Sequence, residues 1–267
     1  EEGTGELRSL LLGVAGIFFT GNPMLDEQAE LPPFTTEFSP LSEGQEASFL
    51  LPWASAGSLL KVHLVWSDPP GAPGANPALI NDLDLEVIAS DGSRYVGNLN
   101  YDAAGESQAE SGSAKDAINN VEGVILRVPE VGRTNVRVSA PSVPGVADLE
   151  GSDRQGYALV ASGVFAAPAP SACEPAALAP GQSLESLRIH GTHFCEGPDL
   201  KVDLGPGFQI GSVEFIDAQT LVLHDVQTEK DAAQGPRDIQ ICVYGKICGT
   251  GQALLQVETS GCACGLG

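Results

Sequence analysis

Two neighbouring segments decide the fold of this chain: LKVHLVWSDPPG at residues 60–71 and LINDLDLEV at residues 79–87. In the first, Leu60, Val62 and Leu64 alternate with polar residues. In the second, leucines alternate with acidic residues. An alternation of period two is typical of a β-strand that buries one face. The Pro- and Gly-rich residues between the two segments predict a loop.

The same pattern recurs along the chain, so that an all-β fold is predicted. Before residue 166, strands are predicted over 47–51, 59–66, 82–89, 121–128, 134–140 and 157–164. After residue 172, they are predicted over 184–190, 200–203, 210–215, 220–226, 237–243 and 253–258. Short strands spaced in this way favour β-sandwiches. A helix or turn is expected only over residues 7–15.

A Pro- and Ala-rich stretch divides the strands into two groups. Residues 166–172 contain Pro168 and Pro170 among alanines and predict a short, stiff linker. The predicted organisation is a leading segment (1–40), a first sandwich (41–165), the linker (166–172), a smaller sandwich (173–260) and a cysteine-containing tail (261–267).

Composition limits the classes of function. The 267 residues include 35 acidic and 13 basic ones, for a net charge of -22. Such a surface repels phosphate backbones, so we expect no nucleic-acid partner. No apolar run approaches the length of a membrane span, and the stretch at residues 10–19 lacks the flanks of a signal peptide.

All six cysteines lie in the last third of the chain: Cys173, Cys195, Cys242, Cys248, Cys262 and Cys264. An even number of cysteines in an acidic, exported chain favours disulfides, and we expect a secreted or cell-surface protein. Zinc is the alternative, although no Cys-x2-Cys pair is present. A turn at residues 244–246 would bring Cys242 and Cys248 together across adjacent strands. Cys173 with Cys195 is the expected second pair, which leaves Cys262 and Cys264 to bond each other or to pair elsewhere.

Acidic and amide side chains gather in the first half, where they suggest a calcium site. Asp82 and Asp84 share the strand face opposite Leu83 and Leu85, and carboxylates two residues apart on a strand lie about 7 Å apart. Ca²⁺ takes six to eight oxygen ligands, so loop residues would complete the shell. The candidate ligands are Asp82, Asp84, Asp68, Asn81 and Asp116. The alternative is that these side chains cap turns by bonding to backbone amides, and it is favoured for Asp68 and Asp116.

The first half resembles a known family in the order of its motifs. The segments at residues 60–71 and 79–87, DGSRYVGN at 91–98, NNVE at 119–122 and the strands at 136–140 and 155–163 are similar to the jelly-roll β-sandwich that follows the catalytic domain in one branch of the subtilisin-like serine proteases. Gly3 and Gly5 resemble the segment that closes such a catalytic domain, although Thr4 stands where the family has an aromatic. The resemblance implies an accessory module that holds calcium and braces the protease.

The second half resembles the small immunoglobulin-like domains of the transcription-factor/plexin type. The likeness rests on LRIHGTHFC at residues 187–195, VEFIDAQTLVL at 213–223 and GPRDIQI at 235–241. Such domains serve as spacers or binding modules.

The string His190-Gly-Thr-His193 matches one that surrounds the catalytic histidine of subtilisin-like proteases, but its context here differs. It ends a predicted strand and has no nucleophile loop to accompany it. A catalytic serine needs a base and a group that orients the base, so we predict no catalytic residues in this chain.

Three functions are compatible with these patterns. The favoured one is a non-catalytic accessory region whose partner is the catalytic domain of the same precursor. The alternative is a module that binds a glycan or a surface protein, for which Trp53 is the better exposed candidate and Trp66 is expected to be buried. The third, an independent hydrolase that uses pairs such as Asp82 and Asp84 or Asp102 and Glu106, has the least support.

Overall fold

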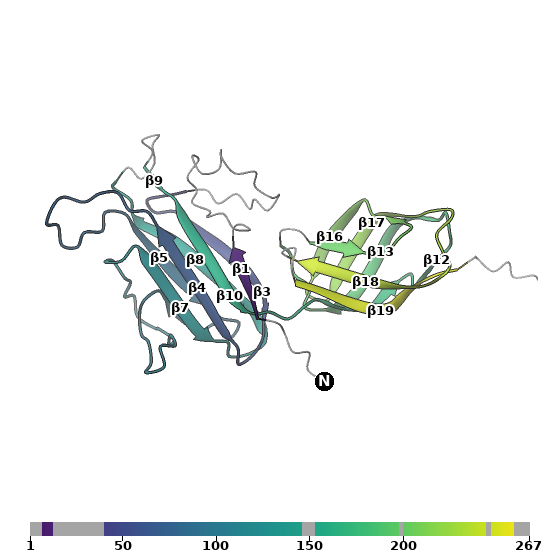
Figure 1. The fold of residues 1–267 in the computed structure, drawn as a ribbon, viewed down its shortest axis with the longest axis horizontal. Coiled ribbons are helices and arrows are strands. Elements are labelled where there is room, and N and C mark those ends of the chain that lie inside the picture. Colours follow the sequence, from purple (N-terminus) through teal and green to yellow (C-terminus); the bar gives the residue numbers. More distant parts are fainter. Residues whose placement is uncertain (1–6, 13–39, 146–152, 198–199, 244–246, 259–267) are drawn as a thin grey trace, which may run out of the picture. The chain divides into compact units, whose positions relative to one another are not determined.

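The computed structural model describes residues 7–12, 40–145, 153–197, 200–243 and 247–258. Within these residues, all regular secondary structure is β-strand (Figure 1). The chain divides into two compact units, residues 1–165 and residues 166–267. The prediction of an all-β fold built from β-sandwiches is therefore confirmed.

The first unit is built from two four-stranded antiparallel sheets. The first sheet has the order β1 (Leu7–Leu12), β10 (Tyr157–Val164), β4 (Leu59–Trp66) and β7 (Val121–Arg127). The second has the order β3 (Glu46–Ala54), β8 (Gly132–Ser142), β5 (Asp82–Ile88) and β6 (Arg94–Val96). A short pair, β2 (Leu41–Ser42) with β9 (Arg154–Gln155), lies beside them.

The alternation seen in the sequence produces the core between these sheets. On β4, Leu60, Val62 and Leu64 are fully buried, whereas Lys61, His63 and Val65 are exposed. On β5, Leu83, Leu85 and Val87 are fully buried as well. The inward faces of two sheets pack together in this way in β-sandwiches.

The free edge of the first sheet is closed by the loop that follows β6. The backbone N–H of Asn98 donates to the Gly123 carbonyl, and Asn98 Oδ1 accepts the Gly123 N–H. Ser107 does the same for Ile125, with its N–H as donor and its Oγ as acceptor. An exposed strand edge is a template for pairing with other chains, and these side chains occupy part of the β7 edge.

The second unit is also built from two sheets. One has the order β11 (Ala169–Glu174), β13 (Ser183–Thr192), β17 (Thr220–Thr228) and β15 (Phe208–Gln209), with β16 (Ser212–Asp217) also paired to β17. The other has the order β12 (Ala177–Leu178), β19 (Ile247–Val257), β18 (Gly235–Val243) and β14 (Lys201–Asp203). Leu187, Ile189, Phe194, Leu223 and Ile241 are among the fully buried residues of its core.

The predicted linker over residues 166–172 is wrong in its second half, because Ala169–Glu174 forms strand β11 against β13. Pro170 is tolerated there because β11 is the edge strand of its sheet, and an edge strand has one side on which no ladder hydrogen bond is required. Two glycines admit this strand: a Cβ at Gly249 would overlap the Pro168 carbonyl oxygen, and one at Gly251 would overlap that of Pro170.

A second correction concerns the helix or turn expected over residues 7–15. Leu7–Leu12 is instead strand β1, which pairs along its whole length with β10 of the first unit. Ladder hydrogen bonds to a neighbouring strand override a weak local preference. The segment around Gly3 and Gly5 and the tail at 261–267 lie outside the described residues.

Candidate functional site

Three carboxylates near the start of β5 and the start of β7 form the most unusual cluster of the first unit. Glu122 on β7 is fully buried, and its Oε2 accepts the backbone N–H of Leu85 on β5 at 2.7 Å. Asp84 is 5% exposed and Asp82 is half-buried. Asp82 Oδ1, Asp84 Oδ1 and Glu122 Oε1 are all buried without a hydrogen-bond partner. Buried polar atoms of this kind require an explanation, and the capacity to bind a cation is one.

Glu122 connects the two sheets of the sandwich. It shares the inward face of β7 with Val124 and Leu126, which are fully buried. Its carboxylate then reaches Leu85 in the opposite sheet. Gly97 makes room for this, because a Cβ at that position would overlap the Glu122 side chain. The carboxylate therefore occupies a place that an apolar side chain fills elsewhere on the strand.

Burial and mutual repulsion raise the pKa values of the cluster. The pKa of Glu122 is raised to about 8, mainly by burial, with further contributions from Asp84, Asp116 and Asp82. The pKa of Asp82 is raised to about 6 by burial and by the neighbouring Asp84 and Asp116. Burial also raises the pKa of Asp84, and Lys115 opposes that shift. A site of this kind favours either protons or a cation.

Lys115 is the positive charge that the protein itself supplies to this region. Its Nζ lies 3.6 Å from Asp84 Oδ2 and 4.0 Å from Glu86 Oε2. Glu86 also pairs with Arg94 and with Arg137, so its charge is compensated from three sides. Among the described residues, no ion pair compensates the charge of Asp82 or of Glu122 in this way.

Asp68 and Asn81, which were predicted as ligands, hold the base of the loop between β4 and β5. Asp68 accepts the backbone N–H groups of Ile80 and Asn81, one on each carboxylate oxygen, at 2.9 and 2.7 Å. Asn81 is fully buried, and its amide bonds to both backbone groups of Gly145 and to Gln155 Oε1. Asp68 therefore bonds to backbone amides as the capping alternative expects, whereas Asn81 ties this loop to Gly145 and Gln155.

Asp116 is likewise committed to its own loop. Its carboxylate accepts hydrogen bonds from Asn98 Nδ2 at 2.6 Å, from Asn119 Nδ2 at 2.8 Å and from the Ile118 N–H at 3.0 Å. Although burial opposes it, this hydrogen bonding holds the pKa of Asp116 below its ordinary value. Asp82 and Asp84 are therefore the predicted ligands that retain unpartnered oxygens.

Glu122 and Lys115 are the members of the site that sequence reasoning missed. The signal for Glu122 was present, since an acidic residue at an inward position of an alternating strand, two residues before Val124, is unusual. Lys115 lies in a long loop, where periodicity carries no information. Among the described residues, no group of three or more His, Cys, Asp or Glu side chains is arranged to hold a metal ion as it stands.

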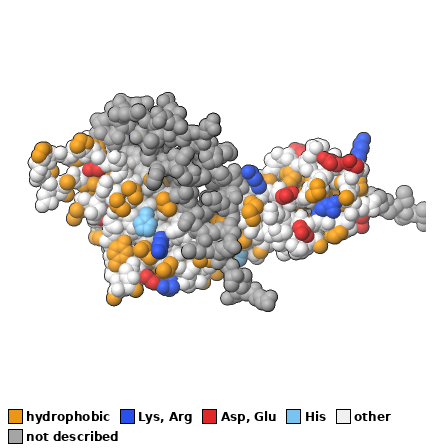
Figure 2. Space-filling model, in the orientation of Figure 1, with side chains coloured by type: hydrophobic (Ala, Val, Ile, Leu, Met, Phe, Trp, Pro, Cys, Tyr) orange, Lys and Arg blue, Asp and Glu red, His pale blue; other side chains and the backbone are white. Residues whose placement is uncertain are grey.

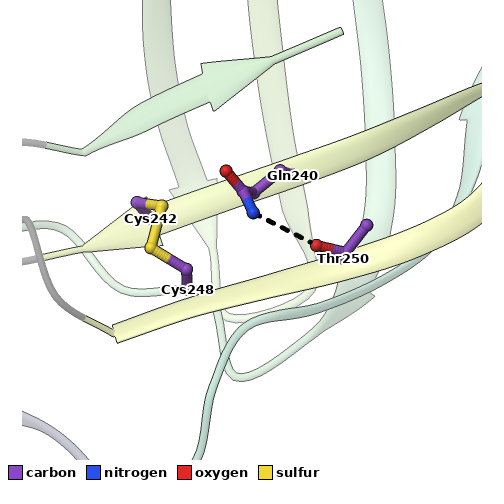
Figure 3. The surroundings of a disulfide bond; sticks show 4 residues. All are labelled: Gln240, Cys242, Cys248 and Thr250. Atoms are coloured by element: carbon purple, nitrogen blue, oxygen red, sulfur yellow. Dashed lines mark hydrogen bonds between the residues drawn. A yellow bond between two sulfur atoms is a disulfide. The ribbon is translucent and has the colours of Figure 1, made fainter. Parts of the chain in front are cut away.

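The cysteine predictions have a divided outcome. Cys242 and Cys248 form a disulfide between the paired positions of β18 and β19, as predicted (Figure 3). Beside it, Gln240 Nε2 donates to Thr250 Oγ1 across the same two strands. The predicted pairing of Cys173 with Cys195 is wrong, because Cys173 is a free thiol buried in the core. Its Sγ donates to the Leu254 carbonyl of β19 at 3.1 Å. Cys262 and Cys264 lie outside the described residues.

The His190-Gly-Thr-His193 string lies at the end of β13 and just beyond it. His190 Nε2 is 4.0 Å from Glu174 Oε2 at the surface, and Gly191 admits the backbone of Ala169 and the ring of Phe194. His224, on β17, is 2.7 Å from Glu214 Oε2. Neither of these His–Glu pairs includes a nucleophile.

Trp66 is buried, as expected, with 3% of its surface exposed, and its Nε1 donates to the Asn81 carbonyl. Trp53 is half-buried. Within the described part of the chain, there is no helix long and apolar enough to cross a membrane.

Comparison with known proteins gives one informative similarity. The chain is 31% identical over 81 residues to the serine protease/ABC transporter B family protein tagB of Dictyostelium discoideum. The matched stretch is 30% of this chain and 4% of that protein, so the chain spans a small part of its relative. No protein-family model matches the chain.

Proposed function

We propose that this chain is a non-catalytic accessory region of a secreted, subtilisin-like serine protease, where it stabilises or positions the catalytic domain. The observation that carries the proposal is the similarity to a protein whose name includes a serine protease. The motifs that resemble the protease-associated sandwich support it, since they lie on β4, β5 and β7 of a single β-sandwich unit. The Cys242–Cys248 disulfide is compatible with an extracellular location.

A non-catalytic role is supported by the use made of the histidines. A serine protease needs a histidine within hydrogen-bond reach of a nucleophile, about 3 Å. His190 and His224 are instead paired with Glu174 and Glu214 at the surface of the second unit. The chemistry of the complete protein would then reside in another domain.

The native gene product tests this proposal directly. Intact mass and peptide mapping of the protein isolated from its source should reveal a segment before Glu1 that carries a catalytic Asp, His and Ser. Removal of the present chain from that protein should lower the melting temperature of the protease. A native protein that lacks any such catalytic segment would contradict the proposal.

We further propose that the first unit binds calcium through Asp82, Asp84 and Glu122. Their unpartnered oxygens are hard donors of the kind that Ca²⁺ prefers. Their pKa values are raised mainly by burial and further by neighbouring carboxylates. Bound calcium would supply the positive charge that neutralises this repulsion. Because the three side chains are not arranged around one point as they stand, binding would require them to turn toward the ion.

Calcium-dependent melting tests the ion site. Millimolar Ca²⁺ should raise the melting temperature of the first unit relative to protein treated with a chelator, since a ligand that binds only the folded state stabilises it. Glu122→Gln and Asp84→Asn should abolish the increase, while Glu130→Gln, at an exposed position, should preserve it. A melting temperature that calcium leaves unchanged in the unaltered protein would overturn the proposal.

A further inference from the structure

One end of the first unit carries a group of exposed apolar side chains. Ile118 is 70% exposed, Val121 is 46% exposed, and Val65 and Tyr101 are each 42% exposed. We call these four residues the apolar corner. They are four of the seven exposed large hydrophobic residues among the described part of the chain. Most such residues on a soluble monomer are scattered, so a group of them indicates an interaction surface.

Hydrogen bonds and strand pairing hold the apolar corner together. Val65 on β4 is the direct partner of Val121 on β7. Beyond this pair, Trp66 and Asn120 exchange two hydrogen bonds, which fixes the segment that carries Ile118. Tyr101 Oη donates to the Gly123 carbonyl of β7 at 2.6 Å. Figure 2 shows hydrophobic side chains on one face of the first unit.

A proline-rich loop leaves β4 next to this corner. Residues 69–79 contain four prolines and no charged residue, in a chain of net charge -22. Asp68 clamps the base of the loop through Ile80 and Asn81, and the Ala75 N–H donates to the Ala72 carbonyl in a turn at the tip. The loop is the dark blue one at the left of Figure 1. A convex loop that is already ordered loses little entropy on binding.

The chain enters and leaves the first unit at the opposite end. Leu7, where β1 begins, pairs with Val164, where β10 ends. Tyr157, at the start of β10, pairs with Trp66 beside the apolar corner. Strand β10 spans eight residues, so these two ends are separated by roughly 25 Å at the usual rise per residue. Polypeptide that precedes β1 or follows β10 is therefore attached far from the apolar corner.

The chemistry of this surface restricts what it binds. A lipid surface is disfavoured, because insertion at an interface uses basic residues beside Trp, Phe or Leu, and the loop has only Leu79 at its base. A glycan usually requires exposed aromatic platforms, and Tyr101 is the one aromatic residue of the apolar corner. Proline rings are instead recognised by protein surfaces that offer aromatic and aliphatic side chains. Tyr101, Ile118, Val121 and Val65 are such a surface.

We propose that the apolar corner and the loop at residues 69–79 form a two-fold contact between two copies of this chain. The loop of each copy lies on the apolar corner of the other, so that the two halves of the contact are identical. The contact places uncharged surfaces together and keeps the acidic surfaces of the two chains apart. It also leaves the attached ends of both copies facing outward.

Sedimentation velocity of the full 267-residue chain tests this contact. We expect a monomer–dimer equilibrium that shifts toward dimer as the salt concentration rises, because salt screens the repulsion between two chains of charge -22. Ile118→Asp and, from the other half of the contact, Pro70→Asp should each weaken the dimer by about tenfold or more, since each buries a charge. Both positions are exposed, so the fold should be retained, and a melting curve checks this.

Ile216→Asp is the matched control. Ile216 is 46% exposed on β16 of the second unit, and its replacement adds the same charge at another apolar position. It should leave the dimerisation constant unchanged. A chain that stays monomeric up to about millimolar concentration in high salt, where even weak contacts are detected, overturns the proposal. A dimer that Ile118→Asp and Pro70→Asp leave intact also overturns it.

Discussion

The two units of this protein share an architecture but differ in what they bury. Among the described residues, the buried polar side chains Asn81, Asp84, Ser107, Asp116, Glu122, Thr134 and Gln155 all belong to the first unit, and Thr228 is the one in the second. The interior of the second unit is formed by aliphatic residues with Phe194 and the Cys173 thiol. That unit also contains the disulfide.

This difference separates two ways of stabilising a small sandwich. In the first unit, buried polar groups tie loops to strands and also bring carboxylates together, so we expect its stability to depend on pH. In the second unit, an apolar core and a disulfide take the place of such a network.

The largest effect is expected from Asn81→Ala, which attacks the polar interior of the first unit. The change removes three hydrogen bonds, to the N–H and carbonyl of Gly145 and to Gln155 Oε1, so the free energy of unfolding should fall by about 3 kcal/mol. Tryptophan fluorescence measures this selectively, because Trp53 and Trp66 are the only tryptophans and both lie in the first unit.

Asn119→Ala provides the comparison for that measurement. Its exposed side chain donates a hydrogen bond to Asp116, and the loss of that bond should cost less than about 1 kcal/mol. If Asn81→Ala and Asn119→Ala lowered the free energy of unfolding equally, the buried hydrogen bonds would contribute no more to the stability of the first unit than an exposed one.

A smaller effect is expected from the double change Cys242→Ser and Cys248→Ser in the second unit. The disulfide closes a short loop, with a sequence separation of 6, so its removal should lower stability by about 2 kcal/mol. Hydrogen exchange of β18 and β19 should accelerate, while the tryptophan transition stays in place. A shift of that transition would mean that the two units do not differ in this respect.

The smallest effect is expected from pH, in protein freed of divalent cations. The folded-state pKa values of Glu122 and Asp82 are raised, so the native state holds protons that the unfolded state has released. Stability of the first unit should therefore fall as pH rises from 6 to 7, by about 1 kcal/mol. Denaturant unfolding followed by tryptophan fluorescence measures the slope. Glu122→Gln should reduce it, and Glu130→Gln should not.

Local patterns in the sequence predicted much of the fold. The bounds of β4 and β10 match the prediction, because buried and less buried residues alternate over the full length of each strand. The Cys242–Cys248 disulfide was predictable because a hairpin needs only adjacent strands. The shared face of Asp82 and Asp84, expected from the period of two, stays a prediction, because the ladder of β5 with β8 is irregular between these two residues.

What sequence could not provide depends on contacts between distant segments. Glu122 joins the cluster because its carboxylate crosses to Leu85 in the other sheet, 37 residues away in sequence. Strand β1 exists through its pairing with β10, and no local pattern specifies that partner. Strand β11 contains Pro170, which argues against a strand unless its position at an edge is known.

The glycines beside β11 bear on how this protein can be divided. The carbonyl groups of Pro168 and Pro170 fill the space over Gly249 and Gly251, so the proline segment is packed into the second unit. An excised second unit that begins at Cys173 would expose a groove along β19 and lose most of an edge strand. A cut at or before residue 167 keeps that strand. Any side chain introduced at Gly249 or Gly251 would displace the proline segment from β19.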